Sequence, residues 1–259
     1  MRTNRAPWIV TTAAGLCLWA VPAFAAEFKS GEKQNLFVEL YTSEAVKAAP
    51  AAAKWISAFR DSPELWTRIV PAAFHVDYGD RPGRWKDRFA GKARTERLVA
   101  YAAKWGLLSP YVPTAVQNGE EWSGWARGQE LPAQPETPAG VLSARCGKVD
   151  AVYVSFVPAE ASGNWVAHAA LLGFGVRSKV DGGPNLGKTL THDFVVLEEA
   201  KNPFVRKRDV YRADLKLRLK AETAVDALGV AVWVTRGENP LPVQCTGGYI
   251  KPPQKNRKK

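Results

Sequence analysis

The sequence predicts an α+β fold in which a small α/β domain is followed by an all-β antiparallel sandwich. Over residues 27–128, short apolar runs alternate with helical patterns, as in a small sheet covered by helices. Over residues 141–250, apolar and polar residues alternate almost throughout, as in strands with one buried and one solvated face. Between these regions, prolines recur every third residue and predict an extended linker over 129–140.

Each element of the first half has its own signal. Residues 36–41 form an apolar run of the length of a buried strand. Thr42 to Glu44 is a polar turn before a helix predicted over 45–60, whose apolar residues share one stripe. The remaining elements are a strand over 69–77, a helix over 93–105 stopped by Gly106, a strand over 112–117 and a hairpin turn at Asn118-Gly119.

The second half is predicted to contain strands and no helix. Its strands show the period of two that places alternate side chains on opposite faces of a sheet. They are predicted over 151–157, 165–176, 195–197, 211–217, 228–234 and 244–250.

The amino terminus has the pattern of a secretory signal peptide. Arg2 and Arg5 precede an apolar stretch from Trp8 to Val21, which is shorter than the roughly 20 residues that span a membrane. Ala23-Phe24-Ala25 then gives the small-x-small cleavage pattern. We therefore expect residues 1–25 to be removed after Ala25 and the protein to be periplasmic or secreted, with no transmembrane segment in the mature chain.

The basic charge is concentrated in a short tail. The full chain carries a formal charge of +11, but Arg2 and Arg5 leave with the leader and five basic residues lie in 251–259. A Pro- and Lys-rich tail cannot pack a core and is predicted to be disordered. The charge therefore gives no support for a nucleic-acid groove, and weak contact of the tail with an anionic surface is the alternative to simple solvation.

Two cysteines remain once Cys17 is removed with the leader. In an oxidising compartment, Cys146 and Cys245 predict one disulfide that clamps the sandwich and contributes roughly 4–5 kcal/mol by loop closure. Two separate buried thiols, or a bridge between two molecules, are the open alternatives. The pair is too widely spaced for a zinc site or a redox motif.

Several segments carry a family resemblance that covers nearly all of the mature chain. They are VELYTSEAVKAAPAAA (38–53), AAFHVDYGDRPGRWKDRFA (72–90), ARTERLVAYAAKWGL (93–107), PYVPTAVQNGE (110–120) and GGPNLGKTLTHDFVV (182–196). In these segments the chain resembles the secreted bacterial thioredoxin-like proteins called the domain of unknown function 1223 family. The resemblance implies a thioredoxin-like fold for residues 27–128.

The chain departs from that family at the motif that would carry redox chemistry. The family's strand runs into a T-S-x-G-C-x-x-C-P turn, and its two cysteines fall on Val46 and Ala49 here. Dithiol chemistry needs a thiolate, usually stabilised at a helix amino terminus. Because valine and alanine have no ionisable atom, dithiol oxidoreductase activity is excluded at this motif.

The resemblance also implies a binding surface around the degenerate motif. Pro113 aligns with a proline that is usually cis in thioredoxin-like folds and exposes neighbouring backbone groups to an extended peptide. A turn proline is the alternative. The candidate surface comprises Thr42, Ser43, His75, Tyr78, Val112 and Pro113.

The sequence therefore favours binding and leaves an enzymatic role open. We expect an exported, non-redox thioredoxin-like protein that assists the folding or assembly of an unknown exported protein or peptide. The alternative is a thiol-linked enzyme, a glutathione-type transferase or peroxidase, that uses Ser43 in place of the lost cysteines. A Ser43, His75 and Asp77 triad lacks the G-x-S-x-G turn, and no cofactor, metal ligand set or catalytic residue is predicted.

Overall fold

The protein is β-rich, with strands in three sheets and two α-helices among the described residues. The computed structural model describes residues 26–77, 86–147, 150–160, 163–218 and 224–251. The helices are α1 (Ala49–Ser57) and α2 (Lys92–Lys104), and short 3-10 helices cover Ala58–Asp61, Ser123–Arg127 and Gly183–Asn185. The strands are β1 (Ala26–Lys29), β2 (Leu36–Thr42), β3 (Ile69–His75), β4 (Thr114–Gln117), β5 (Glu120–Glu121), β6 (Gly140–Cys146), β7 (Ala151–Pro158), β8 (Trp165–Phe174), β9 (Val176–Lys179), β10 (Thr189–His192), β11 (Val195–Pro203), β12 (Val205–Lys207), β13 (Val210–Lys216), β14 (Ala227–Arg236) and β15 (Pro242–Lys251). This is an α+β fold, as the sequence predicts.

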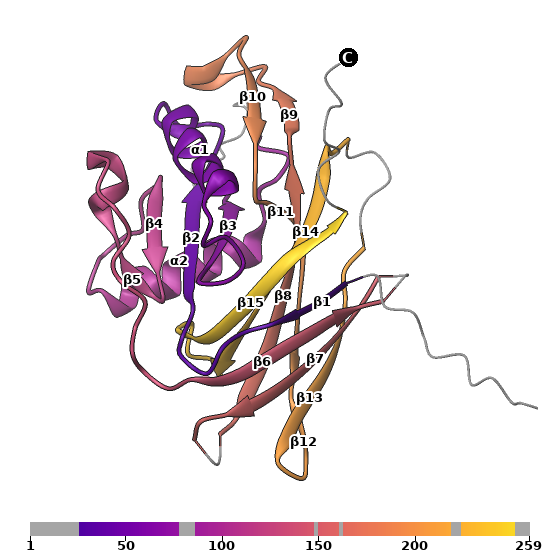
Figure 1. Ribbon diagram of the computed structural model, residues 1–259. Coiled ribbons are helices and arrows are strands. Elements are labelled where there is room, and N and C mark those ends of the chain that lie inside the picture. The colour runs from indigo at the N-terminus through magenta and orange to yellow at the C-terminus, as the bar shows by residue number, and fades with distance from the viewer. Residues whose placement is uncertain (1–25, 78–85, 148–149, 161–162, 219–223, 252–259) are drawn as a thin grey trace, which may run out of the picture.

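One eight-stranded sheet runs through both halves of the chain. Its order is β15-β14-β8-β11-β3-β2-β4-β5, so strands from the second half continue directly into strands from the first (Figure 1). The junction is short: β11 pairs in parallel with β3 through Val195 and Ala73. Beyond it, β2 runs parallel to β3 and antiparallel to β4.

The large sheet curls so that its far strands meet. β15 lies at one end of the strand order, yet the side-chain amide of Asn35, just before β2, donates a hydrogen bond of 3.0 Å to the carbonyl of Cys245. Trp233 of β14 stacks on Phe37 of β2 with ring centroids 4.9 Å apart. The curled face encloses the first core, whose largest buried side chains include Phe37, Tyr41, Phe74, Tyr101, Phe174, Phe194 and Trp233.

A second sheet covers the other face of the β8–β14–β15 region. It has the order β1-β6-β7-β13-β12 and is entirely antiparallel. The two sheets bury a second core, contributed by alternate residues of their strands, as in a sandwich. Its members include Leu142, Val154, Phe156, Leu171, Leu215, Val230 and Val232.

The two predicted domains share a sheet and a core. Side chains of β2 and β3 pack in the first core together with those of β8, β11 and β14. β1 pairs with β6, so the first strand belongs with the second half. Gly140, the last residue of the predicted linker, is the first residue of β6. Lys251, the first residue of the predicted tail, is the last residue of β15. Residues 1–25 and 252–259, predicted as signal peptide and tail, lie outside the described residues.

Most predicted elements are present, with shifted ends. α1 begins at Ala49 instead of Ala45, because residues 43–48 form turns and Pro50, which has no backbone N–H, suits a first helical turn. Gly106 ends the second helix with a φ of +75°, a value that favours glycine. Asn118 and Gly119, both with positive φ, form the predicted turn between β4 and β5. Strands β1, β6, β9, β10 and β12 were not predicted.

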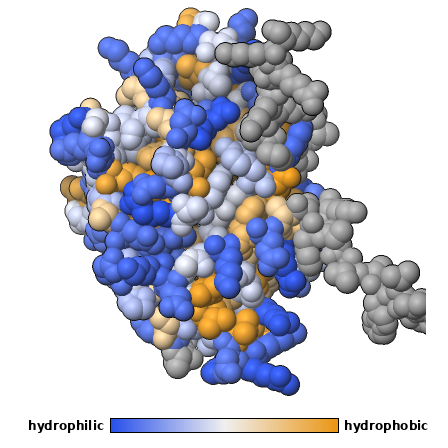
Figure 2. All heavy atoms as spheres, in the orientation of Figure 1, coloured by the Kyte–Doolittle hydropathy of each residue, from blue (hydrophilic) through white to orange (hydrophobic). Residues whose placement is uncertain are grey.

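The surface is mostly hydrophilic on the face shown in Figure 2, and apolar residues gather in its lower part, over the five-stranded sheet. Among the residues that the structure describes, no helix has the length and hydropathy to cross a membrane.

Candidate functional site

The turn that follows β2 carries the residues aligned with the family's redox motif. Val46 donates its N–H to the carbonyl of Ser43 at 3.1 Å, and Ala49 does the same to Val46, so two tight turns lead into α1. Val46 is half-buried, while the side chain of Ala49 packs inward and is 3% exposed. Neither residue offers a reactive atom at the position where the motif would place a thiol.

Ser43 is fully buried in this turn. Its Oγ accepts a hydrogen bond of 3.3 Å from the N–H of Ala45, a local side-chain turn typical of serine. The hydroxyl stabilises the turn and does not cap α1, which begins six residues later. Thr42 is also buried, and its Oγ1 has no hydrogen-bond partner among the described residues. Neither hydroxyl is exposed to an external substrate.

His75, at the end of β3, is paired with Asp87 instead of Asp77. His75 Nδ1 lies 2.6 Å from Asp87 Oδ2, and the Asp87 carboxylate also accepts the N–H groups of Glu44 (2.8 Å) and Phe89 (2.9 Å). Burial by itself raises the pKa of Asp87, but His75 and these N–H groups outweigh it and lower the pKa to about 2. Because the carboxylate is ionised and can only accept, His75 Nδ1 carries the proton.

A second histidine, His192 of β10, meets the same turn from the second half of the chain. Its Nε2 lies 2.8 Å from Glu44 Oε1, and its ring is 4.9 Å from that of His75 at a nearly perpendicular angle. Burial lowers the pKa of His192, although its contact with Glu44 opposes this effect. Phe89 packs against both imidazoles. The four polar side chains of Glu44, His75, Asp87 and His192, here called the buried polar cluster, are each less than 5% exposed.

Asn185, in the segment between β9 and β10, also holds the backbone of the turn. Its side-chain amide donates to the carbonyls of Glu44 (3.0 Å) and Val46 (2.8 Å), while Lys188 Nζ donates to its oxygen at 3.0 Å. The turn is therefore held through the N–H of Glu44 and through the carbonyls of Glu44 and Val46. Figure 1 shows why these segments meet: the β9–β10 hairpin lies beside the start of α1.

The Val112–Pro113 bond is cis, as the resemblance implies. Tyr41 pairs with Thr114 across β2 and β4, so Pro113 lies at the same end of the sheet as Thr42. Val112 and Pro113 are half-buried, and Val112 packs against the first core. Tyr78, also placed in the candidate surface, lies outside the described residues.

The structure brings most of the predicted residues to one end of the sheet, but Thr42, Ser43 and His75 are buried there and form no exposed surface. It also adds residues that the sequence did not single out. Thr42, Ser43 and His75 lie at one end of the sheet with Pro113, whereas Glu44, Asp87 and Asn185 were not predicted. For His192, the sequence pattern favours only a hydrogen bond that stabilises a turn. All four lie within the segments that carry the family resemblance, which was the available signal.

The buried polar cluster is an enclosed network of hydrogen bonds. Within the described parts of the chain, no three His, Cys, Asp or Glu side chains are grouped to hold a metal ion. His75 Nε2 is buried and has no hydrogen-bond partner among those residues. The contacts that these residues make to the turn fix its backbone through hydrogen bonds.

The predicted disulfide between Cys146 and Cys245 is wrong. Both thiols are free and buried, and they lie in different cores. Cys146 ends β6 and faces the interior of the sandwich. Cys245 lies on the opposite face of β15, where burial and the Glu39 carboxylate raise its pKa well above the usual range. The sequence does not reveal strand β6, and it does not show that Cys245 faces the first core, so the separation of the two thiols could not be read from it.

Comparisons with known proteins agree with this fold. Protein AGR_C_4864 from Agrobacterium tumefaciens is similar in structure, with a TM-score of 0.51 and 21% identity over 89% of this chain and 100% of that one. HBP35 of Porphyromonas gingivalis gives a TM-score of 0.57 with 15% identity, over 85% of this chain and 76% of its own. At these identities the likeness shows the fold alone. No curated protein matches the chain. The sequence profile of a family described as proteins of unknown function, DUF1223, matches residues 37–235, and the chain therefore belongs to that family.

Proposed function

We propose that this protein is an exported binding protein whose thioredoxin-like first half has lost its dithiol. The half-buried and exposed part of the turn, residues 45–48, together with Val112 and Pro113, would bind an extended segment of an exported partner. The observation that carries the proposal is the fixation of this turn by the buried polar cluster and Asn185, around positions without a reactive atom. A rigid turn with no chemistry to perform is suited to recognition.

Rigidity favours binding because less conformational freedom is lost when the ligand arrives. The N–H of Glu44 and the carbonyls of Glu44 and Val46 are already hydrogen-bonded, so the turn is ordered before any contact. Half-buried Val46, Val112 and Pro113 offer apolar contact at its edge. We expect the partner to present an extended, largely apolar polypeptide segment, as an exported protein does before it folds.

The thiol-linked alternative gains no support from the site. It requires Ser43 to meet a thiol substrate, yet Ser43 is fully buried and its Oγ is engaged with the N–H of Ala45. No observation in the described residues favours a second function over binding.

The proposal predicts that a charge at Val46 weakens binding of an unfolded polypeptide. The probe is reduced and carboxymethylated α-lactalbumin, which stays unfolded, and its affinity is measured by fluorescence anisotropy. Because an apolar segment would have to desolvate the new carboxylate, Val46→Asp should raise the dissociation constant about tenfold or more.

The matched control is Val99→Asp, which places the same charge at a valine that is 46% exposed on α2. It should leave the affinity unchanged. Equal effects of the two substitutions, or no measurable binding of the probe by the unaltered protein, would overturn the proposed surface. Circular dichroism of both variants establishes that they fold.

A further inference from the structure

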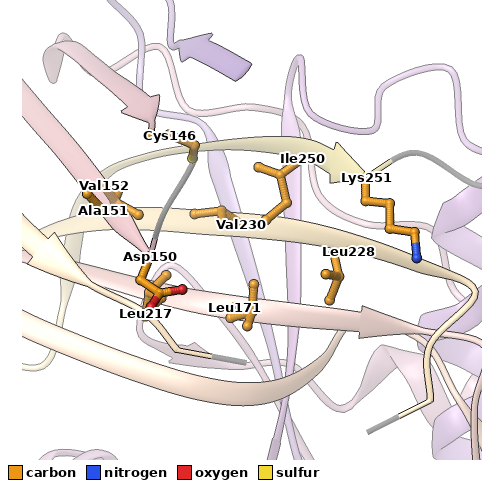
Figure 3. Close-up of a pocket in the computed structure, with 11 residues that line it drawn as sticks. Cys146, Asp150, Ala151, Val152, Leu171, Leu217, Leu228, Val230, Ile250 and Lys251 are labelled. Carbon is orange, nitrogen blue, oxygen red and sulfur yellow. The ribbon is translucent and has the colours of Figure 1, made fainter. Parts of the chain in front are cut away.

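A hollow region lies away from the candidate functional site, between the two sheets of the sandwich. There the sheets leave a cavity of about 240 Å³, next to the end of β6 (Figure 3). None of its lining residues belongs to the turn or to the buried polar cluster. The lining is mainly aliphatic, from Ala151, Val152, Leu171, Leu217, Leu228, Val230 and Ile250, with Cys146, Gly147, Asp150 and Lys251 completing it.

The cavity is built by ordered backbone. Gly147 donates its N–H to the carbonyl of Ala151 at 2.8 Å, and Leu217 donates to that of Asp150 at the same distance. These bonds tie together the ends of β6, β7 and β13 on one side of the space. Val230 of β14 and Leu171 of β8 form the opposite wall, and Val230 is only 1% exposed. The walls therefore belong to the rigid sandwich core.

Two charged side chains lie at opposite ends of the aliphatic lining, as Figure 3 shows for Asp150 and Lys251. Asp150 already has a partner, because Arg218 Nε lies 3.8 Å from its Oδ2. Lys251 forms no ion pair with any residue that the structure describes. Burial raises the pKa of the Cys146 thiol to about 11, so Cys146 adds no negative charge at neutral pH. Within the described parts of the chain, the charge left without a partner beside the cavity is thus positive.

We propose that this cavity binds a free aliphatic carboxylate of medium chain length, with the chain between the sheets and the carboxylate on Lys251. An engineered cavity of roughly 150 Å³ holds benzene, so 240 Å³ accommodates a chain of about six to eight carbons. Each buried methylene should tighten binding about fourfold until the cavity is full. The proposal is independent of the function proposed for the turn.

Isothermal titration calorimetry of the full chain tests this directly. We expect affinity to rise from butanoate to hexanoate to octanoate by about an order of magnitude per step. Methyl octanoate, which has the chain and an ester without the charge, should bind about tenfold more weakly than octanoate. Octylamine should bind more weakly still. Equal affinities for octanoate, its methyl ester and octylamine would overturn the assignment of Lys251, as would failure of octanoate to bind.

Two variants locate the site. Lys251→Glu should reverse the preference so that octylamine binds more tightly than octanoate, whereas Lys207→Glu, at an exposed lysine of β12, should leave it unchanged. Leu228→Phe, at the partly exposed edge of the cavity, should weaken octanoate and its methyl ester alike by filling the space. Unchanged octanoate affinity in both Lys251→Glu and Leu228→Phe would place any binding elsewhere and overturn the proposal.

Discussion

Asp87 connects three otherwise separate parts of the candidate site. Its carboxylate accepts from His75, from the N–H of Glu44 in the turn, and from the N–H of Phe89. A buried carboxylate is costly unless each such bond is made, so these contacts explain why an acidic residue occupies a position only 1% exposed. The same contacts make the site sensitive to acid.

The pKa values of Asp87 and His192 predict loss of stability with falling pH. The pKa of Asp87 is lowered from 3.8 to about 2 on folding, so its contribution is present above about pH 4 and lost as pH falls towards 2. That shift corresponds to about 2 kcal/mol. The pKa of His192 is also lowered, so protonation from about pH 6.5 downwards already favours the unfolded chain.

Urea denaturation between pH 7 and pH 2.5 measures this dependence. Asp87→Asn should be less stable at pH 7 by about 2–3 kcal/mol, because one bonding oxygen is replaced by a donor, and should lose less stability between pH 4 and pH 2.5. Asp214→Asn, on the solvent-facing side of β13, is the matched control and should preserve the unaltered profile. A parallel pH profile in Asp87→Asn would contradict the role given to this carboxylate.

At the scale of elements, the β9–β10 hairpin and the 3-10 helix inside it hold the turn that follows β2 in place. The contacts of Asn185 and His192 with this turn are here called the clamp. Asn185 and His192 lie in a segment more than 130 residues away from the turn in sequence, yet they contact Glu44 and Val46. The conformation of the turn is thus set largely by side chains outside it. A change in the clamp should alter the turn without touching its own residues.

Asn185→Asp tests the clamp. Replacing the amide removes both donors and brings an oxygen towards the carbonyls of Glu44 and Val46, so we expect a loss of about 2–3 kcal/mol of stability in urea denaturation. Asn202→Asp is the control, because Asn202 also donates its amide to a backbone carbonyl, that of Asp214, but at an exposed site. A loss in Asn185→Asp no larger than that in Asn202→Asp would show that the clamp contributes little.

For the whole molecule, the shared core predicts that the two halves fold together. Phe37 and Phe74 from the first half contact Trp233 from the second, and Asn35 bonds to Cys245. Residues 26–128 alone would expose these surfaces to water. We therefore expect a single unfolding transition for the full chain, with coincident curves from circular dichroism and tryptophan fluorescence.

The same reasoning predicts that residues 26–128, expressed alone, lack fixed tertiary structure. Near-ultraviolet circular dichroism and amide dispersion in an NMR spectrum provide the measurement. Two separated transitions in the full chain, or a natively dispersed spectrum for the fragment, would show that the halves are independent domains after all.

The sequence predicted what local patterning determines. Leu36 to Tyr41 is apolar except for Glu39 and forms a central strand, while Tyr211 to Leu217 alternates and forms most of a strand with one exposed face. The candidate site could be predicted only where the family resemblance supplied it, as with Pro113. The contact between Glu44 and His192 joins residues 148 positions apart, and no local pattern encodes it. The wrong prediction for Cys245 has the same origin. Which core its side chain enters depends on how the whole sheet curls, and no local pattern encodes that.

The curled sheet also has a consequence for how the polypeptide is made. The hydrogen bond between Asn35 and Cys245 spans 210 positions, so the first core cannot close until almost the whole described chain has been synthesised. Folds dominated by such distant contacts form slowly, because a large loop must be ordered before its contacts are gained. If the protein is exported as proposed, this delay favours its passage through a secretion channel. A chain that has not yet closed its core is still unfolded, and an unfolded chain can pass through a narrow channel.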